Sequence, residues 1–340
     1  MELSKFGRVK HLGDEPCRFK TSAVFEPNRK SDIMGGKEKF YNMPGVHPHR
    51  ALSTGANTLT GHCARLLVRS LVEKQSYDRD YFLDLYIDFM LHTPDKDTYI
   101  DALHVEFFER YSRGNKPYYS AGMGKAATEA VSLGLVMVTP LLVYLSVQEE
   151  LRDALIAKGE GRYSFYNLQY SARHASPLVV ENSMQDVVYQ FVELFFRTET
   201  MQMYAMQWTT LMKKLLLGFP AKAELWDAAR KVDVELDALI PLPDDEVVGG
   251  CYSPCNLMEH AYPCILYIAA KYVDDPEGAI VVSANLGGDS TNRTALVAAL
   301  MGAIHGYTEI PLRWREKVQD VKRLDADCQA LVLLGMYLKP

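Results

Sequence analysis

Apolar residues recur at every third or fourth position along most of this chain after about residue 60. The clearest case is the run Tyr81-Phe82, Leu85-Tyr86 and Phe89-Met90. This spacing places apolar side chains on one face of an α-helix. We find neither the apolar–polar alternation that is typical of strands nor a regular alternation of strands with helices. The sequence therefore predicts an all-α fold, a compact domain of many helices.

Proline residues divide the helical part of the chain. Pro94 ends the helix that contains Tyr81, and Pro241 ends a later helix that has a charged face. We interpret the acidic run Asp244-Asp245-Glu246 as a solvated loop. The later helices are expected over residues 178–196, 199–217, 221–239, 256–272, 276–285, 291–306 and 324–336.

The first fifty residues differ from the rest of the chain. They are rich in glycine, proline, asparagine and charge, with breakers at Gly35-Gly36, Pro44-Gly45 and Pro48. Such a composition is typical of irregular structure. We therefore expect an irregular N-terminal segment over residues 1–50, packed on a single all-α domain over residues 51–340.

Composition and charge exclude several classes of protein. The 340 residues are 48% hydrophobic, and 37 basic against 43 acidic residues give a net charge of −6. This balance argues against a basic surface for nucleic acid. The longest apolar run, residues 130–147, is interrupted by Ser132, Gly134 and Thr139-Pro140, so it predicts a buried helix and no membrane span.

Cysteine use and the N-terminal residues bear on location. Six cysteines in a chain of this length do not form a disulfide framework. The N-terminal residues lack the apolar stretch that a signal peptide needs. We therefore expect a soluble cytoplasmic protein in a reducing compartment. The sequence leaves the oligomeric state open.

The most distinctive segment runs from Ser283 to Arg293, between an apolar helix and a helix of small residues. Gly287-Gly288 permits backbone torsions that other residues resist. Asp289 and Ser290 then stand at a helix start, where side-chain oxygens cap free amides. One interpretation is a capped helix after a tight turn. The other is a polar cluster on a rigid turn, directed at a ligand or an ion.

This segment resembles the C-terminal signature of the ADP-ribosylglycohydrolase family. The resemblance runs from Leu286-Gly287-Gly288-Asp289 through Ala303-Ile304-His305-Gly306 to Ile310-Pro311-Leu312-Arg313-Trp314. Three weaker matches lie upstream: Thr54–Thr58, where the family has Thr-Asp-Asp-Thr, Tyr118–Met123, and Arg173–Pro177. Together they cover roughly residues 50 to 325. The resemblance implies an orthogonal all-α bundle, in agreement with the helical spacing.

The family holds two Mg²⁺ ions with carboxylates from these two motifs, and this chain has lost most of them. Ala56 and Asn57 stand where the family has aspartates, and Thr291 replaces an aspartate after Asp289. Hard cations need oxygen ligands, preferably carboxylates. We therefore expect no two-metal site and no cofactor, with Mg²⁺ bound only if one weak site at Asp289, Asn57 and Thr58 persists. One interpretation of Arg293 is that it occupies the vacated charge position and pairs with Asp289, which turns the metal site into a salt-bridged or a phosphate-binding one.

The resemblance implies a ligand pocket between residues 54–62 and 286–293. We expect it to bind ADP-ribose or a related nucleotide or glycoside, and any reaction to be hydrolysis of the bond at ribose C1. Asp289 is the candidate catalytic residue. The candidate ligand-binding residues are Asn57, Thr58, Ser120, Gly122, His174, Gly287, Gly288, Ser290, Thr291, Asn292 and Arg293. The alternative is a non-catalytic pseudoenzyme of the same fold, acting as a binding, scaffold or crystallin-like structural protein.

Two further groups of polar residues stand upstream. His47-Pro48-His49 with His62 fits no familiar metal-binding spacing and is interpreted as solvent-exposed. Asp95, Asp97 and Asp101 with His92 and His104 surround a helix start. Capping of that helix by Asp97 explains part of this cluster. A place for the cluster at the rim of the pocket is the alternative. No general base is identified.

Overall fold

Helices form the regular structure of this protein. The computed structural model describes residues 32–33, 49, 52–93, 96–97, 99–157 and 184–336. Within those ranges we find no strand, and the only pairings of the β type are isolated bridges between Val131 and Leu257 and between Val248 and Tyr252. The all-α prediction is therefore confirmed. The predicted irregular segment over residues 1–50 lies outside the described residues except for Asp32, Ile33 and His49.

The first half of the domain contains one long helix and several shorter ones. The helices are α1 (Leu59–Lys74), α2 (Arg79–His92), α3 (Ala102–Ser112), the short α4 (Pro117–Ser120) and α5 (Ser132–Ala157), with a 3₁₀ turn over Ala126–Thr128. Side chains cap three of them: Thr58 at α1, Asp78 at α2 and Asp101 at α3. Each accepts a hydrogen bond from a free amide of the first turn, as residues of these types do.

The second half supplies the remaining helices. They are α8 (Met184–Phe195), α9 (Glu199–Leu216), α10 (Ala221–Arg230), α11 (Leu236–Leu239), α12 (Asp244–Val247), α13 (Met258–Lys271), α14 (Pro276–Asn285), α15 (Ser290–His305), α16 (Leu312–Arg315) and α17 (Val321–Met336), with a 3₁₀ turn over Tyr307–Glu309. The prediction of a single helix over residues 221–239 is wrong in one respect. It is broken between α10 and α11, where Asp233 has a φ of 57°.

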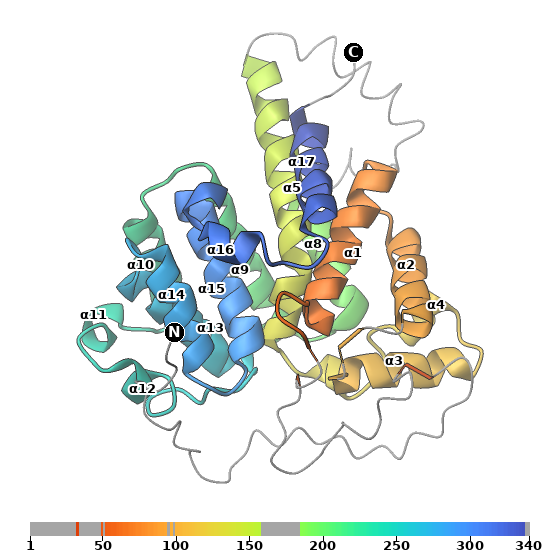
Figure 1. Ribbon diagram of the computed structural model, residues 1–340, viewed down its shortest axis with the longest axis horizontal. Helices are drawn as coiled ribbons and strands as arrows, with labels where there is room; N and C mark the ends of the chain where they lie inside the picture. Colours follow the sequence, from red (N-terminus) through yellow and green to blue (C-terminus); the bar gives the residue numbers. More distant parts are fainter. Residues whose placement is uncertain are drawn as a thin grey trace.

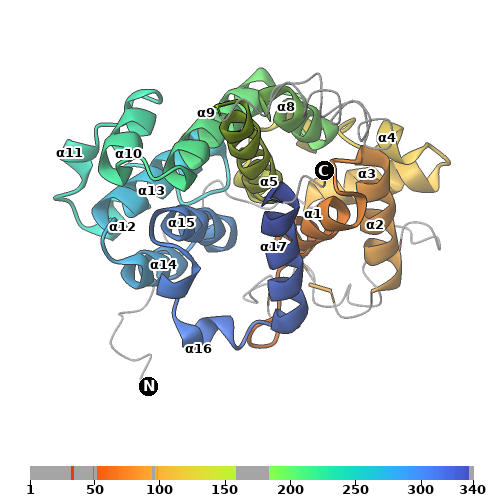
Figure 2. The same cartoon turned by 90° about the horizontal axis from the view of Figure 1, so that it is seen from above.

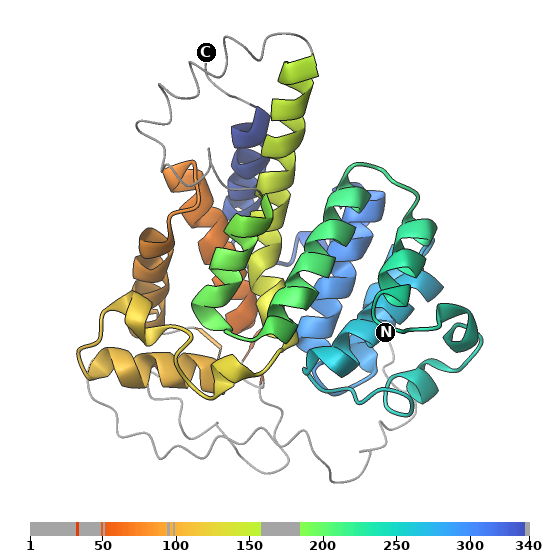
Figure 3. The same ribbon diagram turned by 180° about the vertical axis from the view of Figure 1, so that it is seen from behind.

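Helix α5 is the centre of the bundle. It packs against α1, α8, α9, α15 and α17, which come from the beginning, the middle and the end of the described chain. Figure 1 shows α1–α3 on one side of α5 and α13–α15 on the other, and Figure 2 shows α17 beside α5 and α1. From behind, α8 and α9 cover α5 and α15 (Figure 3). Most of the buried residues of α5 are apolar, so burial of this helix joins the helices around it.

None of the described helices is both long enough and apolar enough to cross a membrane.

The acidic run after α11 differs from its prediction as a solvated loop. It forms α12, and the Asp244 carboxylate accepts hydrogen bonds from the hydroxyls of Tyr267 (2.8 Å) and Tyr272 (2.7 Å) and from Lys271 Nζ (2.9 Å). All three donors belong to the end of α13. Asp244 therefore attaches the segment between α11 and α13 to the C-terminal end of α13.

Candidate functional site

The turn between α14 and α15 is held against the segment that precedes α13. The Asp289 amide donates a 2.8 Å hydrogen bond to the Pro254 carbonyl. Gly288 has a φ of 64°, and a Cβ at this position would lie 2.0 Å from the same carbonyl oxygen. Only glycine fits such a close approach in the left-handed region. Asp289 is the N-cap of α15, so its predicted place at a helix start is confirmed.

The Asp289 carboxylate is surrounded by hydrogen-bond donors. Asn292 Nδ2 lies 3.2 Å from Oδ1 and 3.1 Å from Oδ2. The hydroxyl of Ser132, a fully buried residue at the start of α5, donates to Oδ2 at 2.8 Å. In the sequence Ser132 is only a break in an apolar run. The signal that identifies it is a polar residue directly before the apolar first half of α5.

The start of α5 is in turn fixed to the start of α13. Ser132 N donates to the Asn256 carbonyl at 2.9 Å, and Met258 N donates to the Ala130 carbonyl at 2.9 Å. Segments 130–132, 254–258 and 287–289 are therefore joined by backbone hydrogen bonds. They place the N-termini of α5 and α15 next to each other.

Arg293 does not take the role that the sequence suggested. Its side chain is 2% exposed, and Nη2 donates to the carbonyls of Ser283 (2.9 Å) and Gly287 (2.7 Å). These carbonyls stand at the C-terminal end of α14, where the helix dipole favours a positive charge. The structure describes no ion pair between Arg293 and Asp289, so the prediction of that pair is wrong. Arg293 instead caps α14 from the first turn of α15.

The second motif segment precedes α1. Thr58 is the N-cap of this helix, and its hydroxyl oxygen accepts a hydrogen bond from Gly61 N at 3.3 Å. The Gly55 carbonyl accepts from Gln319 N at 2.9 Å, which anchors the segment to the chain before α17. Asn57 Nδ2 is buried and has no hydrogen-bond partner among the described residues. Asn292 Oδ1, in the other motif, is also buried and also has no hydrogen-bond partner among the described residues.

Three long helices direct their N-termini to this region. The N-terminal ends of α1, α5 and α15 lie at the lower end of the bundle in Figure 1. Each N-terminus carries a partial positive charge and free amides. The two polar motifs therefore occupy the positive end of the central helices.

The other predicted ligand-binding residues are placed as follows. Ser290 and Thr291 are half-buried in the first turn of α15. Ser120 is fully buried and donates to the Lys116 carbonyl at 3.1 Å. Gly122 has a φ of 61° and lies against the Leu194 carbonyl. Packing contacts thus account for Ser120 and Gly122, whereas His174 lies outside the described residues.

Asp97 has a different role from the predicted one. Asp101, not Asp97, is the N-cap of α3. The buried Asp97 carboxylate instead accepts from the backbone of α1, with Leu59 N 3.4 Å from Oδ2. His49 Nδ1 lies 2.6 Å from the same oxygen, which corrects the interpretation of His49 as a solvent-exposed loop residue. His62, on the first turn of α1, has its pKa lowered to about 4, chiefly by burial, so its ring is neutral at physiological pH.

The residues of the two motifs do not fit a pair of Mg²⁺ ions. Asp289 is the only carboxylate in the motifs, and hydrogen bonds from Ser132 and Asn292 already occupy its oxygens. In the part of the chain that the structure describes, no three or more His, Cys, Asp or Glu residues are grouped so that they could hold a metal. A dinuclear centre needs several such oxygen ligands around each ion.

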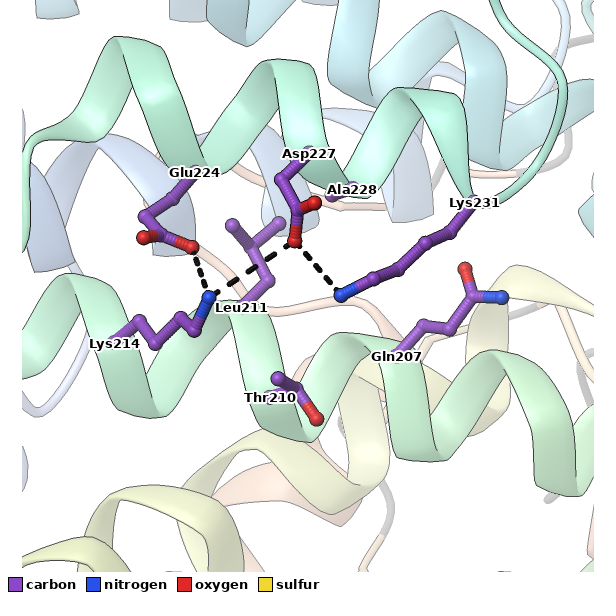
Figure 4. Close-up of a pocket in the computed structure, with 8 residues that line it drawn as sticks. All are labelled: Gln207, Thr210, Leu211, Lys214, Glu224, Asp227, Ala228 and Lys231. Atoms are coloured by element: carbon purple, nitrogen blue, oxygen red, sulfur yellow. Dashed lines mark hydrogen bonds and ion pairs between the residues drawn. The ribbon is translucent and has the colours of Figure 1, made fainter.

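A small hollow between α9 and α10 contains none of the motif residues (Figure 4). Its volume of about 10 Å³ has room for about one water molecule. Lys214 pairs with Glu224 at 2.6 Å, and Lys231 pairs with Asp227 at 2.8 Å. These charges satisfy one another, whereas Gln207 Oε1, also at this hollow, is buried without a hydrogen-bond partner among the described residues.

Comparisons with known proteins bear on the family of this chain. The sequence profile described as ADP-ribosylglycohydrolase matches residues 22–338. A solved structure described as "ADP-ribosylglycohydrolase-related protein complex" shares the fold, with a TM-score of 0.56 and 19% identity over 91% of this chain and 95% of that one. A search of curated proteins found no match. Since the profile covers nearly its whole length, the chain belongs to the ADP-ribosylglycohydrolase family.

Proposed function

We propose that this protein binds ADP-ribose, or a closely related nucleotide or glycoside, without the metal pair of its family. The ligand occupies the positive end of α1, α5 and α15, between the Asn57 and Asp289 segments. If the protein is an enzyme, it hydrolyses the bond at ribose C1 through an oxocarbenium-like transition state. Asp289 then orients the ribose or the attacking water.

The observation that carries the proposal is the state of the two asparagines. Asn57 Nδ2 is a buried donor and Asn292 Oδ1 is a buried acceptor, and neither has a partner within the described residues. A buried polar atom without a partner costs about 1–3 kcal/mol, and a ligand that bonds these two atoms regains that free energy. A ribose hydroxyl both donates and accepts, so a ribose carries groups that suit both atoms.

The helix termini support an anionic ligand. Free amides and the dipole at a helix N-terminus favour phosphate groups. The family's aspartates at positions 56 and 57 are replaced by Ala56 and Asn57, which removes negative charge from the start of α1. This change weakens cation binding and, by the same electrostatics, favours the diphosphate of ADP-ribose.

Calorimetry with ADP-ribose, with Mg²⁺ and with EDTA, tests the proposal. We expect micromolar binding in both conditions and at least a tenfold loss of affinity in the Asn57→Ala and Asn292→Ala variants, since each removes about 1.4 kcal/mol or more. Asn285→Ala is the matched control, because Asn285 is exposed and only bonds the Val281 carbonyl of its own helix. Binding that requires Mg²⁺ would show that other oxygens complete a metal site.

A non-catalytic role is the second candidate. The observation that favours it is that Asp289, the one carboxylate left in the motifs, serves as a helix cap and accepts from Ser132. Absence of ADP-ribose binding in both conditions would support this candidate and contradict the first.

A further inference from the structure

We propose that His49 and Asp97 form the general-base pair of this site, a role that rests on the proposed function. Asp97 is the positioning residue, and His49 is the residue that takes the proton. Chemistry without a metal-bound water needs such a base. Neither residue belongs to the two motifs, and the pair joins positions 48 residues apart.

The geometry is that of a histidine oriented by a buried carboxylate. The Asp97 side chain is 0% exposed and the His49 side chain is 19% exposed. His49 Nδ1 lies 2.6 Å from Asp97 Oδ2, a distance typical of a strong charge-assisted hydrogen bond. Tyr99 N donates to Asp97 Oδ1 at 3.2 Å and Leu59 N lies 3.4 Å from Oδ2, so the backbone fixes the carboxylate.

The carboxylate determines which nitrogen of His49 is basic. Asp97 accepts a hydrogen bond, so the proton lies on Nδ1 and the lone pair lies on Nε2. A carboxylate in this position also stabilises the imidazolium that forms when Nε2 accepts a proton. His49 thus combines a partly exposed ring with a wholly buried carboxylate partner.

The pair stands at the α1 side of the proposed pocket. Asp97 bonds the backbone of Leu59, and Asn57 precedes Leu59 by two residues. The other titratable side chains nearby do not duplicate the role. His62 is kept neutral by burial and by Arg65, and Lys96 Nζ donates to the Thr93 carbonyl at 3.1 Å.

The step that follows is a hydrolysis. The oxygen of water forms a bond to ribose C1, and the bond from C1 to the leaving oxygen or nitrogen breaks, with its electron pair passing to the leaving atom. One proton of the water moves to His49 Nε2. The imidazolium then releases that proton, and the leaving atom gains one, so the net reaction adds one water across the bond.

Acylation of His49 by diethyl pyrocarbonate tests the pair without any turnover. The reagent modifies neutral imidazole nitrogens, and the modified residue is identified by peptide mass spectrometry. We expect His49 to react in the wild type and ADP-ribose to slow that reaction. His92 is the control, since it forms an exposed pair with Asp88 at 3.0 Å and lies on the surface of α2. Its reaction is not expected to respond to ADP-ribose.

Hydrolysis of an arginine peptide and a serine peptide that carry ADP-ribose, followed as released ADP-ribose, tests the role. We expect His49→Ala to lower kcat by about 100-fold or more with little change in KM, and added imidazole to restore part of the rate. Asp97→Asn is expected to lower kcat in the same direction, and His92→Ala to leave it unchanged. His49→Gln provides a second variant if the alanine variant folds poorly.

The outcomes separate the two proposals. Absence of ADP-ribose binding by calorimetry contradicts the proposed function and, with it, this role. Binding without hydrolysis of either peptide, full activity of His49→Ala, or a His49 that ADP-ribose does not protect overturns the general-base pair and leaves ligand binding intact.

Discussion

The hydroxyl of Ser132 donates a 2.8 Å hydrogen bond to Asp289 Oδ2 across 157 residues of sequence. It joins the first residue of the central helix α5 to the N-cap of α15. The backbone amide of the same serine donates a hydrogen bond to the Asn256 carbonyl, in the segment before α13. One residue, through its hydroxyl and its backbone amide, thus joins three segments of the proposed pocket.

Replacing Ser132 with alanine is expected to reduce the free energy of unfolding by about 1.5–3 kcal/mol, the range for a hydrogen bond to a charged group. It also releases the Asp289 carboxylate, so we expect weaker ADP-ribose binding. Urea denaturation and calorimetry measure the two effects. Ser112→Ala is the control, because its hydroxyl only bonds the Glu109 carbonyl in its own helix. Equal stability of the two variants would argue against a structural role for Ser132.

Replacing two glycines of this region with alanine, one at a time, is expected to change the stability of the protein in opposite directions. Gly288→Ala places a Cβ 2.0 Å from the Pro254 carbonyl at a φ of 64°, so we expect a loss of about 2 kcal/mol or more. Gly302 lies within α15 and a Cβ there meets nothing within 4 Å. Gly302→Ala is therefore expected to stabilise the protein by about 0.5–1 kcal/mol. Thermal unfolding of both variants measures the contrast, and equal shifts would contradict it.

Arg293 offers a test between a structural and a ligand-binding role. Arg293→Lys loses the planar guanidinium that reaches the carbonyls of Ser283 and Gly287, and we expect a loss of about 1–3 kcal/mol in the free energy of unfolding. Denaturant titration measures this change. A lysine variant with unchanged stability but tenfold weaker ADP-ribose binding would instead show that Arg293 contacts the ligand.

Asp244 is expected to make stability depend on pH. Burial acts to raise the pKa of its carboxyl, but the hydrogen bonds that it accepts from α13 outweigh burial and lower the pKa. The unfolded chain then binds more protons in this range, so stability rises with pH. The contribution of Asp244 is fully present above the unfolded pKa of about 3.9 and is lost as pH falls through the lower folded pKa.

The Asp244→Asn variant measures that contribution. At pH 7 it is expected to be less stable than the wild type by about 1–3 kcal/mol, because the charge-assisted bonds to Lys271 and the two tyrosines are weakened. Urea denaturation between pH 3 and pH 7 follows both proteins. The difference is expected to shrink toward the acid end, and a constant difference would contradict the assignment.

Most helices and one of the two motif turns could be predicted from the sequence. Apolar spacing predicted α2, α9 and α14 within a few residues, because burial of one helix face leaves a local pattern. The turn at Gly287-Gly288 was also readable, since its torsions exclude other residues locally. The break after Arg230 was missed, because the sequence around Asp233 continues a helical pattern with a charged face.

The sequence by itself thus determined the fold class and the family. Only the tertiary structure decided what the remaining polar groups bond. Arg293 turns to the carbonyls of α14 and not to Asp289, and Asp97 reaches His49 and α1 and not the start of α3. The physical reason is that a helix face is specified by residues a few positions apart. The partner of a buried charge is instead whichever group the packing of distant helices brings within hydrogen-bond distance.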